Sequence, residues 1–263
     1  MSELVYRYRI NRSLFSRIFE SANTLVDEVT IEINQDGFVV RTMDPSHIAL
    51  IDIVLSKNDF ISFVEPEGEA IKFGLRSEEM LKLIKQFKPV DKNDNEDITL
   101  ELVDNKLVIT KQTNDGDKIQ GRIHRIEPSS GTCPLPKLTY NVDVPIPTPK
   151  LSRQIESLSQ VGEYLKLSVD IADARGSECK ITFSTTTDGI DQSNTITIED
   201  SGSIVRETSQ AVYSLDYIQK MVRTMKFAEQ VTVQYSTKMP LRLVVKLGAM
   251  SFIHFYLAPR VQD

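Results

Sequence analysis

Two sets of basic residues have the spacing that a phosphate-binding surface requires. On a helix that turns about 100° per residue, Lys82 and Lys85 point away from an apolar stripe, and Lys220 and Arg223 do the same on another helix. Lys and Arg gathered on one face bind phosphates without reading bases. Aromatic residues do not alternate with these bases, which favours a duplex backbone over stacked single strands. The pattern predicts sequence-independent contact with double-stranded DNA.

The ordinary explanation of these charges is solvation, because the outer side of any amphipathic helix is polar. The chain carries 31 Lys and Arg against 37 Asp and Glu, a net charge of −6. With that excess of acid, carboxylates should occupy the middle of these outer faces as often as bases do, so a face of one sign indicates phosphate binding. The basic set on these helices is Lys82, Lys85, Lys88, Lys220, Arg223 and Lys226, with weaker candidates Arg12 and Arg153 on two other helices.

Catalysis finds little support in the sequence. It contains no glycine-rich phosphate loop, metal-ligand spacing or serine nucleophile elbow. The best acid and base pair is Asp44 with His47, which could transfer a proton. Cys133 and Cys179 lie far apart without a CxxC pair, which predicts reduced thiols and no zinc site. We predict a non-catalytic protein without a cofactor or a metal.

The composition is that of a soluble globular protein. With 263 residues and 40% hydrophobic content, the chain can fill one large or two ordinary cores. No apolar stretch is long enough to span a bilayer, and Glu3, Arg7 and Arg9 interrupt any signal-peptide run. We expect an intracellular protein with no membrane partner.

Short stretches rich in Val, Ile and Thr, separated by Asn, Asp and Gly turns, predict antiparallel sheet over most of the chain. Helical periodicity is confined to residues 13–25, 77–87, 149–161 and 215–225. The first helix is predicted to bury Leu14, Ile18, Ser21 and Leu25, with Ser16 outside and Phe19 nearly exposed. Ser77 is the expected cap of the second helix, and Pro149 opens the third.

The order of one helix, several strands, another helix and several strands occurs twice, and side chains repeat with it. The separation of Lys82 from Lys220 equals that of Lys85 from Arg223. In the other helix pair, Leu14 and Ile18 match Leu151 and Ile155 at a separation shorter by a single residue. Two nearly equal separations indicate a duplicated unit of about half the chain.

A segment rich in Pro, Ser and Gly separates the two repeats and has the chemistry of a linker. We therefore predict an N-terminal lobe at residues 1–121, an interdomain connector at 122–140 and a C-terminal lobe at 141–263. The predicted fold class is α+β, with two similar lobes of antiparallel sheet and two helices in each lobe.

Two motifs at opposite ends of the chain resemble a known family. The segments TMDPSHIALID at 42–52 and YLAPRV at 256–261 closely resemble the signature stretches of archaeal and eukaryotic sliding clamps, the proliferating cell nuclear antigen family. The similarity extends in register over nearly the whole chain, and its ending is similar to archaeal members. The resemblance implies the DNA clamp fold, a trimeric ring of six lobes, and a central hole lined by helices. Arg12, Arg17 and Arg153 would then join the other bases at the hole.

The resemblance also implies a pocket for partner proteins. Such a pocket accepts a short peptide whose helical turn inserts apolar and aromatic side chains, while flanking backbone pairs with the clamp. Carried over by position, it comprises Met43, His47, Ile48, Leu50, Leu135, Pro136, Pro240, Tyr256, Ala258, Pro259 and Val261. Core packing is the simpler alternative for Met43, Ile48, Leu50 and Tyr256. Cys133 stands where many relatives have a larger aliphatic residue, which puts partner preference in doubt.

The implied function is that of a DNA polymerase sliding clamp, a processivity factor in replication and repair. The expected partners are a clamp loader, DNA polymerase, flap endonuclease and DNA ligase. Three identical chains or related paralogues would form the ring, through edge strands near residues 118–123 and 195–198. It would lie with the nucleoid in the cytoplasm of an archaeon, or in the nucleus of a eukaryote. A scaffold that assembles but never touches DNA is the alternative.

Overall fold

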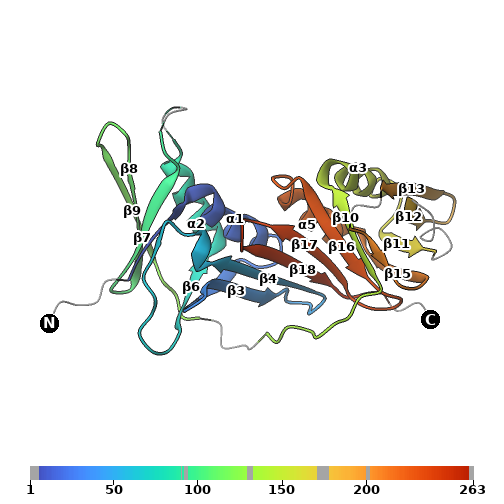
Figure 1. The fold of residues 1–263 in the computed structure, drawn as a ribbon, viewed down its shortest axis with the longest axis horizontal. Coiled ribbons are helices and arrows are strands. Elements are labelled where there is room, and N and C mark those ends of the chain that lie inside the picture. The colour runs from blue at the N-terminus through green and yellow to red at the C-terminus, as the bar shows by residue number, and fades with distance from the viewer. Residues whose placement is uncertain are drawn as a thin grey trace. The chain divides into compact units, whose positions relative to one another are not determined.

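The structure is a computed structural model that describes residues 6–89, 91, 94–128, 133–170, 178–199 and 202–260. The chain divides into two compact units (Figure 1). The first comprises Met1–Pro45, Ile51–Pro134 and Lys246–Ile253, and the second comprises Ser46–Leu50, Leu135–Val245 and His254–Asp263. Within the described residues, no helix is long and apolar enough to cross a membrane.

Two layers of strands and two helices build the N-terminal repeat. One set of strands has the order β5–β1–β7–β8–β9, and another has the order β6–β2–β3–β4. Helix α1 (Arg12–Ala22) packs against α2 (Ser77–Ile84), which a 3₁₀ turn continues over Lys85–Phe87. The strands are β1 (Arg7–Asn11), β2 (Glu28–Asn34), β3 (Gly37–Met43), β4 (Ala49–Ser56), β5 (Ser62–Phe63), β6 (Ile71–Arg76), β7 (Asp97–Val103), β8 (Lys106–Gln112) and β9 (Lys118–His124).

The described residues of the C-terminal repeat likewise form two sets of strands and a pair of helices. Its strands have the orders β13–β12–β11–β15 and β14–β10–β16–β17–β18. Helix α3 (Thr148–Leu158) packs against α5 (Leu215–Thr224). The strands are β10 (Val142–Pro147), β11 (Tyr164–Val169), β12 (Glu178–Thr186), β13 (Asp191–Glu199), β14 (Ile204–Val205), β15 (Ser209–Ser214), β16 (Gln230–Tyr235), β17 (Leu241–Lys246) and β18 (Phe252–Leu257). The predicted α+β fold with two similar lobes is confirmed.

Backbone hydrogen bonds repeat along with the elements. The amide of Ser77, the first residue of α2, donates to the carbonyl of Asp27 at 2.8 Å. The amide of Leu215, the first residue of α5, donates to the carbonyl of Glu163 at 2.9 Å. Both bonds satisfy an amide that the first turn of a helix leaves without an intrahelical partner. The two helix starts have the separation that the sequence predicts from the basic residues of these helices.

The first helix pair matches in a different register from the predicted one. Both α1 and α3 have 11 residues, and they begin at Arg12 and Thr148, so the predicted match of Leu14 with Leu151 is wrong by one residue. Phe15 and Phe19 occupy the core positions of α1, with ring centroids 5.3 Å apart, and Ser16 is buried beside them, whereas Leu14 is only half-buried. Two large rings bury more apolar area than one leucine, which turns the helix by a residue from the predicted face.

Capping differs from the sequence expectation at the second helix. Ser77 is the first residue of α2 and is fully buried, while Arg76 occupies the cap position without a side-chain cap bond. In α1, by contrast, the side chain of Asn11 accepts from the amides of Ser13 and Leu14.

Strand β9 reaches His124, past the predicted lobe boundary at residue 121. It pairs with β8 over its whole length, from Gln112 opposite Lys118 to Lys106 opposite His124. A side-chain carbon at Gly121 would lie 2.5 Å from Leu83 of α2, so glycine allows the helix to approach this strand closely.

Candidate nucleic-acid interface and partner pocket

The six predicted bases on and directly after α2 and α5 are all exposed. Lys82, Lys85 and Lys88 are exposed, while Met80, Ile84 and Phe87 are buried. In the second lobe Lys220, Arg223 and Lys226 are exposed, while Ile218, Val222 and Met225 are buried. Amphipathic periodicity therefore positions both basic faces in the same way.

An ion pair that the sequence analysis missed occurs at the same place in both lobes. Glu78 lies 2.7 Å from Lys82 and Asp216 lies 2.7 Å from Lys220, each pair spanning one helical turn. The hydrogen bond and charge of Lys82 lower the pKa of Glu78, and the same contact raises the pKa of Lys82. Exposed pairs of this kind are weak, so a phosphate can displace the carboxylate. The sequence could have predicted both ion pairs, because each base follows an acid by one helical turn.

A second acid occupies equivalent positions but pairs differently. Glu20 and Glu156 lie at the same position along their helices, counted from the first residues of α1 and α3. Glu20 lies 2.8 Å from Arg17 on its own helix, whereas Glu156 lies 3.1 Å from Lys226, which follows the neighbouring helix α5. Within the described parts of the chain, the predicted bases left without an ion pair are two in each lobe. They are Lys85, Lys88, Arg153 and Arg223.

Arg12 lies in a different environment from the other predicted bases. Its side chain is only 12% exposed, and its guanidinium contacts Glu96 at 3.4 Å. Ser13 donates to the same carboxylate, and this bond is the main cause that lowers the pKa of Glu96, ahead of the charge of Arg12. These contacts fix the start of α1 to Glu96. The geometry favours a structural role for Arg12 over contact with DNA.

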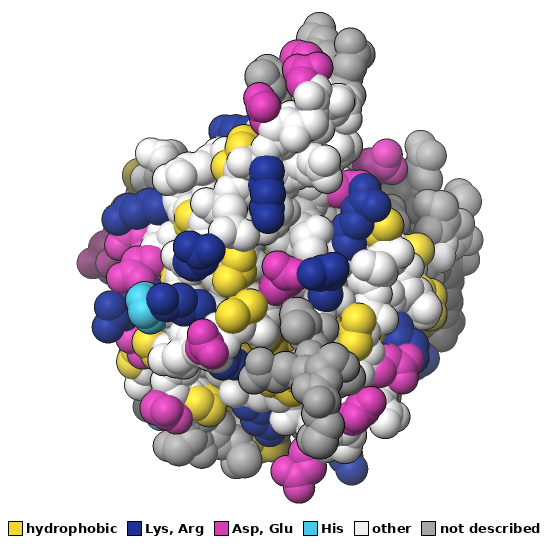
Figure 2. Space-filling model, turned by 90° about the vertical axis from the view of Figure 1, so that its left-hand side faces the viewer, with side chains coloured by type: hydrophobic (Ala, Val, Ile, Leu, Met, Phe, Trp, Pro, Cys, Tyr) yellow, Lys and Arg dark blue, Asp and Glu magenta, His cyan; other side chains and the backbone are white. Residues whose placement is uncertain are grey.

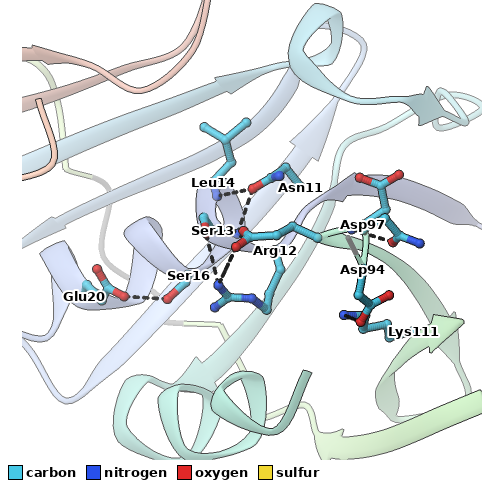
Figure 3. A network of polar contacts seen from close by, with 11 residues as sticks. Asn11, Arg12, Ser13, Leu14, Ser16, Glu20, Asp94, Asp97 and Lys111 are labelled. Carbon is cyan, nitrogen blue, oxygen red and sulfur yellow. Dashed lines mark hydrogen bonds and ion pairs between the residues drawn. The ribbon is translucent and has the colours of Figure 1, made fainter. Parts of the chain in front are cut away.

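A buried ion pair lies next to this network. The ammonium of Lys111 is 2.6 Å from the carboxylate of Asp94, with side-chain exposures of 0% and 3% (Figure 3). No local pattern indicates this pair, because a lysine on a strand is normally solvated.

The sheet face of the N-terminal lobe has a mixed charge. Seen from the side on which β8 and β9 lie, Lys and Arg are interspersed with acidic and apolar side chains (Figure 2). Arg7 pairs with Glu101 and Arg9 with Asp97 across β1 and β7.

The two signature motifs meet in the second unit. The amide of Ala258 donates to the carbonyl of Ile48 at 2.9 Å. Ile48 is 41% exposed, although it is a large apolar side chain, whereas Leu50 and Tyr256 are buried. His47 is exposed and has a left-handed backbone, with φ of 57°.

The other predicted pocket residues are only partly accounted for. Leu135, Pro240 and Pro259 are half-buried and Pro136 is exposed, all within the second unit. Met43 is half-buried in the first unit. Val261 lies outside the described residues. Core packing thus explains Leu50 and Tyr256, whereas it does not explain Ile48, which is exposed.

A cavity of about 140 Å³ in the second unit was not predicted as such. Its lining comes from segments distant in the sequence, which is why local patterns could not find it. It is lined by Lys166, Gln210, Ala211, Val212, Thr237, Lys238, Pro259 and Arg260. Only Pro259 belongs to the predicted pocket.

The two residues of the predicted proton-transfer pair differ in burial. Asp44 is buried and His47 is exposed. Among the residues that the structure describes, no group of three or more His, Cys, Asp or Glu could hold a metal ion. Cys133 is half-buried, and burial raises the pKa of its thiol, which lowers its reactivity.

Family models decide the relationship. The model of the proliferating cell nuclear antigen N-terminal domain matches residues 6–125, and that of its C-terminal domain matches residues 134–260. The chain belongs to the proliferating cell nuclear antigen family. Among curated relatives of this family, the DNA polymerase sliding clamps of Nitrosopumilus maritimus and Cenarchaeum symbiosum are each 32% identical, with 94% of both chains covered.

Solved structures of the proliferating cell nuclear antigen family share the fold. The protein from Thermococcus kodakaraensis has a TM-score of 0.84 at 18% identity, covering 97% of this chain and 100% of that one. A chain from the PCNA2–PCNA3 complex of Sulfolobus tokodaii has a TM-score of 0.79 at 22% identity, with the same coverage. The predicted family, including its archaeal relatives, is confirmed.

Proposed function

We propose that this chain is a DNA polymerase sliding clamp, a processivity factor that encircles duplex DNA in replication and repair. Membership of the family along nearly its whole length is the observation that carries the proposal. The repeated helix faces support it, because each lobe presents two bases that have no ion-pair partner within the described chain.

Three subunits of two lobes form the proposed ring, with Arg17, Arg153 and the bases of α2 and α5 toward the DNA. Edge strands β9 and β13 of neighbouring subunits close it, since each ends its own sheet. Three identical chains suffice for this arrangement, while the complex of two clamps from Sulfolobus tokodaii is a precedent for paralogues. The native mass of the purified chain distinguishes a ring of identical chains from a ring of paralogues. A trimeric mass indicates identical subunits, and a monomeric mass indicates that paralogues are needed.

Partner proteins dock, in this proposal, through a short peptide on the pocket around Ile48, Pro240 and Ala258. Half-buried and exposed apolar side chains there give the peptide a place to bury its own apolar residues. DNA polymerase, flap endonuclease and DNA ligase are the proposed users, and a clamp loader opens the ring. The clamp itself performs no catalysis and acts on chromosomal DNA, at the nucleoid or in a nucleus.

Charge reversal on the helices tests contact with DNA. The variant Lys85→Glu with Arg223→Glu changes two unpaired bases, one in each lobe, and should shorten retention on DNA strongly at low salt. Lys180→Glu with Lys246→Glu is the matched control, because both are exposed lysines on strands. Native mass and circular dichroism confirm assembly and folding. If the protein is a scaffold that never touches DNA, both variants should be retained on DNA to the same extent.

A further inference from the structure

The cavity beside the C-terminal segment is rich in positive charge. Its lining includes Lys166, Lys238 and Arg260 and contains no carboxylate. All three side chains are exposed, and no ion pair holds any of them within the described residues. In a chain of net charge −6, three unpaired cations around one cavity of about 140 Å³ form a local site for an anion.

The guanidinium of Arg260 is held in place without using a carboxylate. Its carbon lies 3.8 Å from the centroid of the Tyr164 ring, and its backbone amide donates to the carbonyl of Val212 at 2.7 Å. Stacking on an aromatic face fixes the plane of the guanidinium and leaves the N–H groups at its edge available. Less conformational entropy is then lost when an anion binds.

The two lysines are also positioned by backbone structure. Lys166 is directly opposite Val212 in the pairing of β11 with β15, so their side chains share one face of the sheet. Lys238 has a left-handed backbone, with φ of 59°, a conformation that non-glycine residues adopt mainly at turns and functional sites. The hydroxyl of Thr237, next to it, accepts from the amide of Gln210 at 3.2 Å and fixes this turn to β15.

We propose that this cavity binds the carboxylate of a Glu or Asp side chain in a partner's docking peptide, and so selects partners with an acidic flank. The inference rests on the proposed function, because it needs a peptide in the neighbouring pocket. Pro259 belongs to both the cavity and that predicted pocket, so an occupant of one reaches the other.

A single side chain fits this cavity better than a nucleic-acid backbone does. Phosphates along DNA require an extended track of bases. Here three cations from a strand, a turn and the C-terminal segment line one small cavity. Carboxylates also match the edge of an arginine side chain in geometry.

Two synthetic peptides test the inference by fluorescence anisotropy. Both peptides carry the same apolar docking turn. They differ at one residue of the flank, which is Glu in the first peptide and Gln in the second. A short series of such pairs places this residue at successive positions along the flank. At its best position, Glu should bind about fivefold more tightly than Gln, the order of magnitude of one partly exposed charge pair. The preference should decrease with salt. Equal affinity of the Glu and Gln peptides at every position would overturn the inference.

Variants separate this inference from the proposed function. Lys238→Glu with Arg260→Glu should remove the preference for Glu while leaving the Gln peptide bound. Lys180→Glu, on β12 of the same sheet, should leave the preference unchanged. Ile48→Ala should weaken both peptides alike, and its failure to do so contradicts the peptide pocket itself. If the wild-type protein binds neither peptide, both this inference and the proposed function are overturned. Displacement of the Glu peptide by inorganic phosphate at matched ionic strength would indicate a general anion site and contradict the assignment to a peptide side chain.

Discussion

Ile48 is the residue at which a partner pocket and simple core packing make different predictions. It is 41% exposed, so truncating it removes less buried area from the chain itself than truncating a core residue does. We expect Ile48→Ala to change the free energy of unfolding by less than about 1 kcal/mol, yet to weaken a docking peptide about tenfold, as loss of an interface side chain does. Tyr256→Ala is a poorer test, because Tyr256 is buried and its truncation destabilises the fold. Unchanged peptide affinity in Ile48→Ala contradicts our placement of the pocket.

Lys111 gives a prediction about stability alone. Removing one member of a buried ion pair leaves the other charge uncompensated. Lys111→Met should therefore destabilise the first unit by about 3 kcal/mol or more in urea unfolding, whereas Lys111→Met with Asp94→Asn should recover part of the loss. Equal stability of the single and double variants would show that the pair is unimportant.

Glu96 should make the stability of the first unit depend on pH in the acidic range. The hydrogen bond from Ser13, together with the charge of Arg12, lowers its pKa below the ordinary value of 4.5. A carboxyl whose folded pKa is depressed stabilises the fold above its unfolded pKa, and this contribution is lost as the pH falls through the folded pKa. In Glu96→Gln, the decline in stability below about pH 4.5 should become shallower. Urea unfolding over a pH series that crosses this value measures the effect, and identical slopes in both proteins contradict it.

Sequence reasoning found the surface bases but misplaced residues whose neighbours come from elsewhere. Lys85 and Arg223 follow from helical periodicity alone. Arg12 does not, because its burial depends on Glu96, which lies outside this helical segment. Phe19 is misplaced because the predicted register turns Leu14 rather than Phe15 toward the core. The cationic cavity has the same origin, since its lysines lie on separate elements.

At the scale of elements, duplication explains most of what could be predicted. The basic helices, their constant separation and the strand content all follow from local patterns. The first helix pair shows the limit, because an amphipathic pattern tolerates a shift of one residue until packing chooses between Phe15 and Leu14.

The repeated acid on α2 and α5 predicts a gain when it is removed. Glu78→Gln with Asp216→Asn frees Lys82 and Lys220, so each lobe presents one more unpaired base. We expect tighter nonspecific DNA binding by about two- to fivefold and a steeper decrease of affinity with salt. Glu32→Gln with Glu101→Gln, which changes acids on strands, is the control. An unchanged salt slope would mean that these faces do not contact phosphate.

At the scale of the whole molecule, the acidic net charge and the basic helices are compatible if DNA is held by topology. A protein of net charge −6 binds duplex DNA poorly by attraction alone. A closed ring needs only enough positive charge in its hole to make the phosphates acceptable and to permit sliding. The mixed charge of the sheet face agrees with this division (Figure 2).

The most direct test measures the lifetime of the loaded protein on closed circular DNA and on the same DNA after it is cut once. A sliding clamp should remain on the circle for many times longer than on the linear molecule, where it leaves through the free ends. Blocking both ends of the linear DNA with tightly bound proteins should restore retention. Equal release rates from circular and open linear DNA would contradict encirclement and, with it, the proposed function.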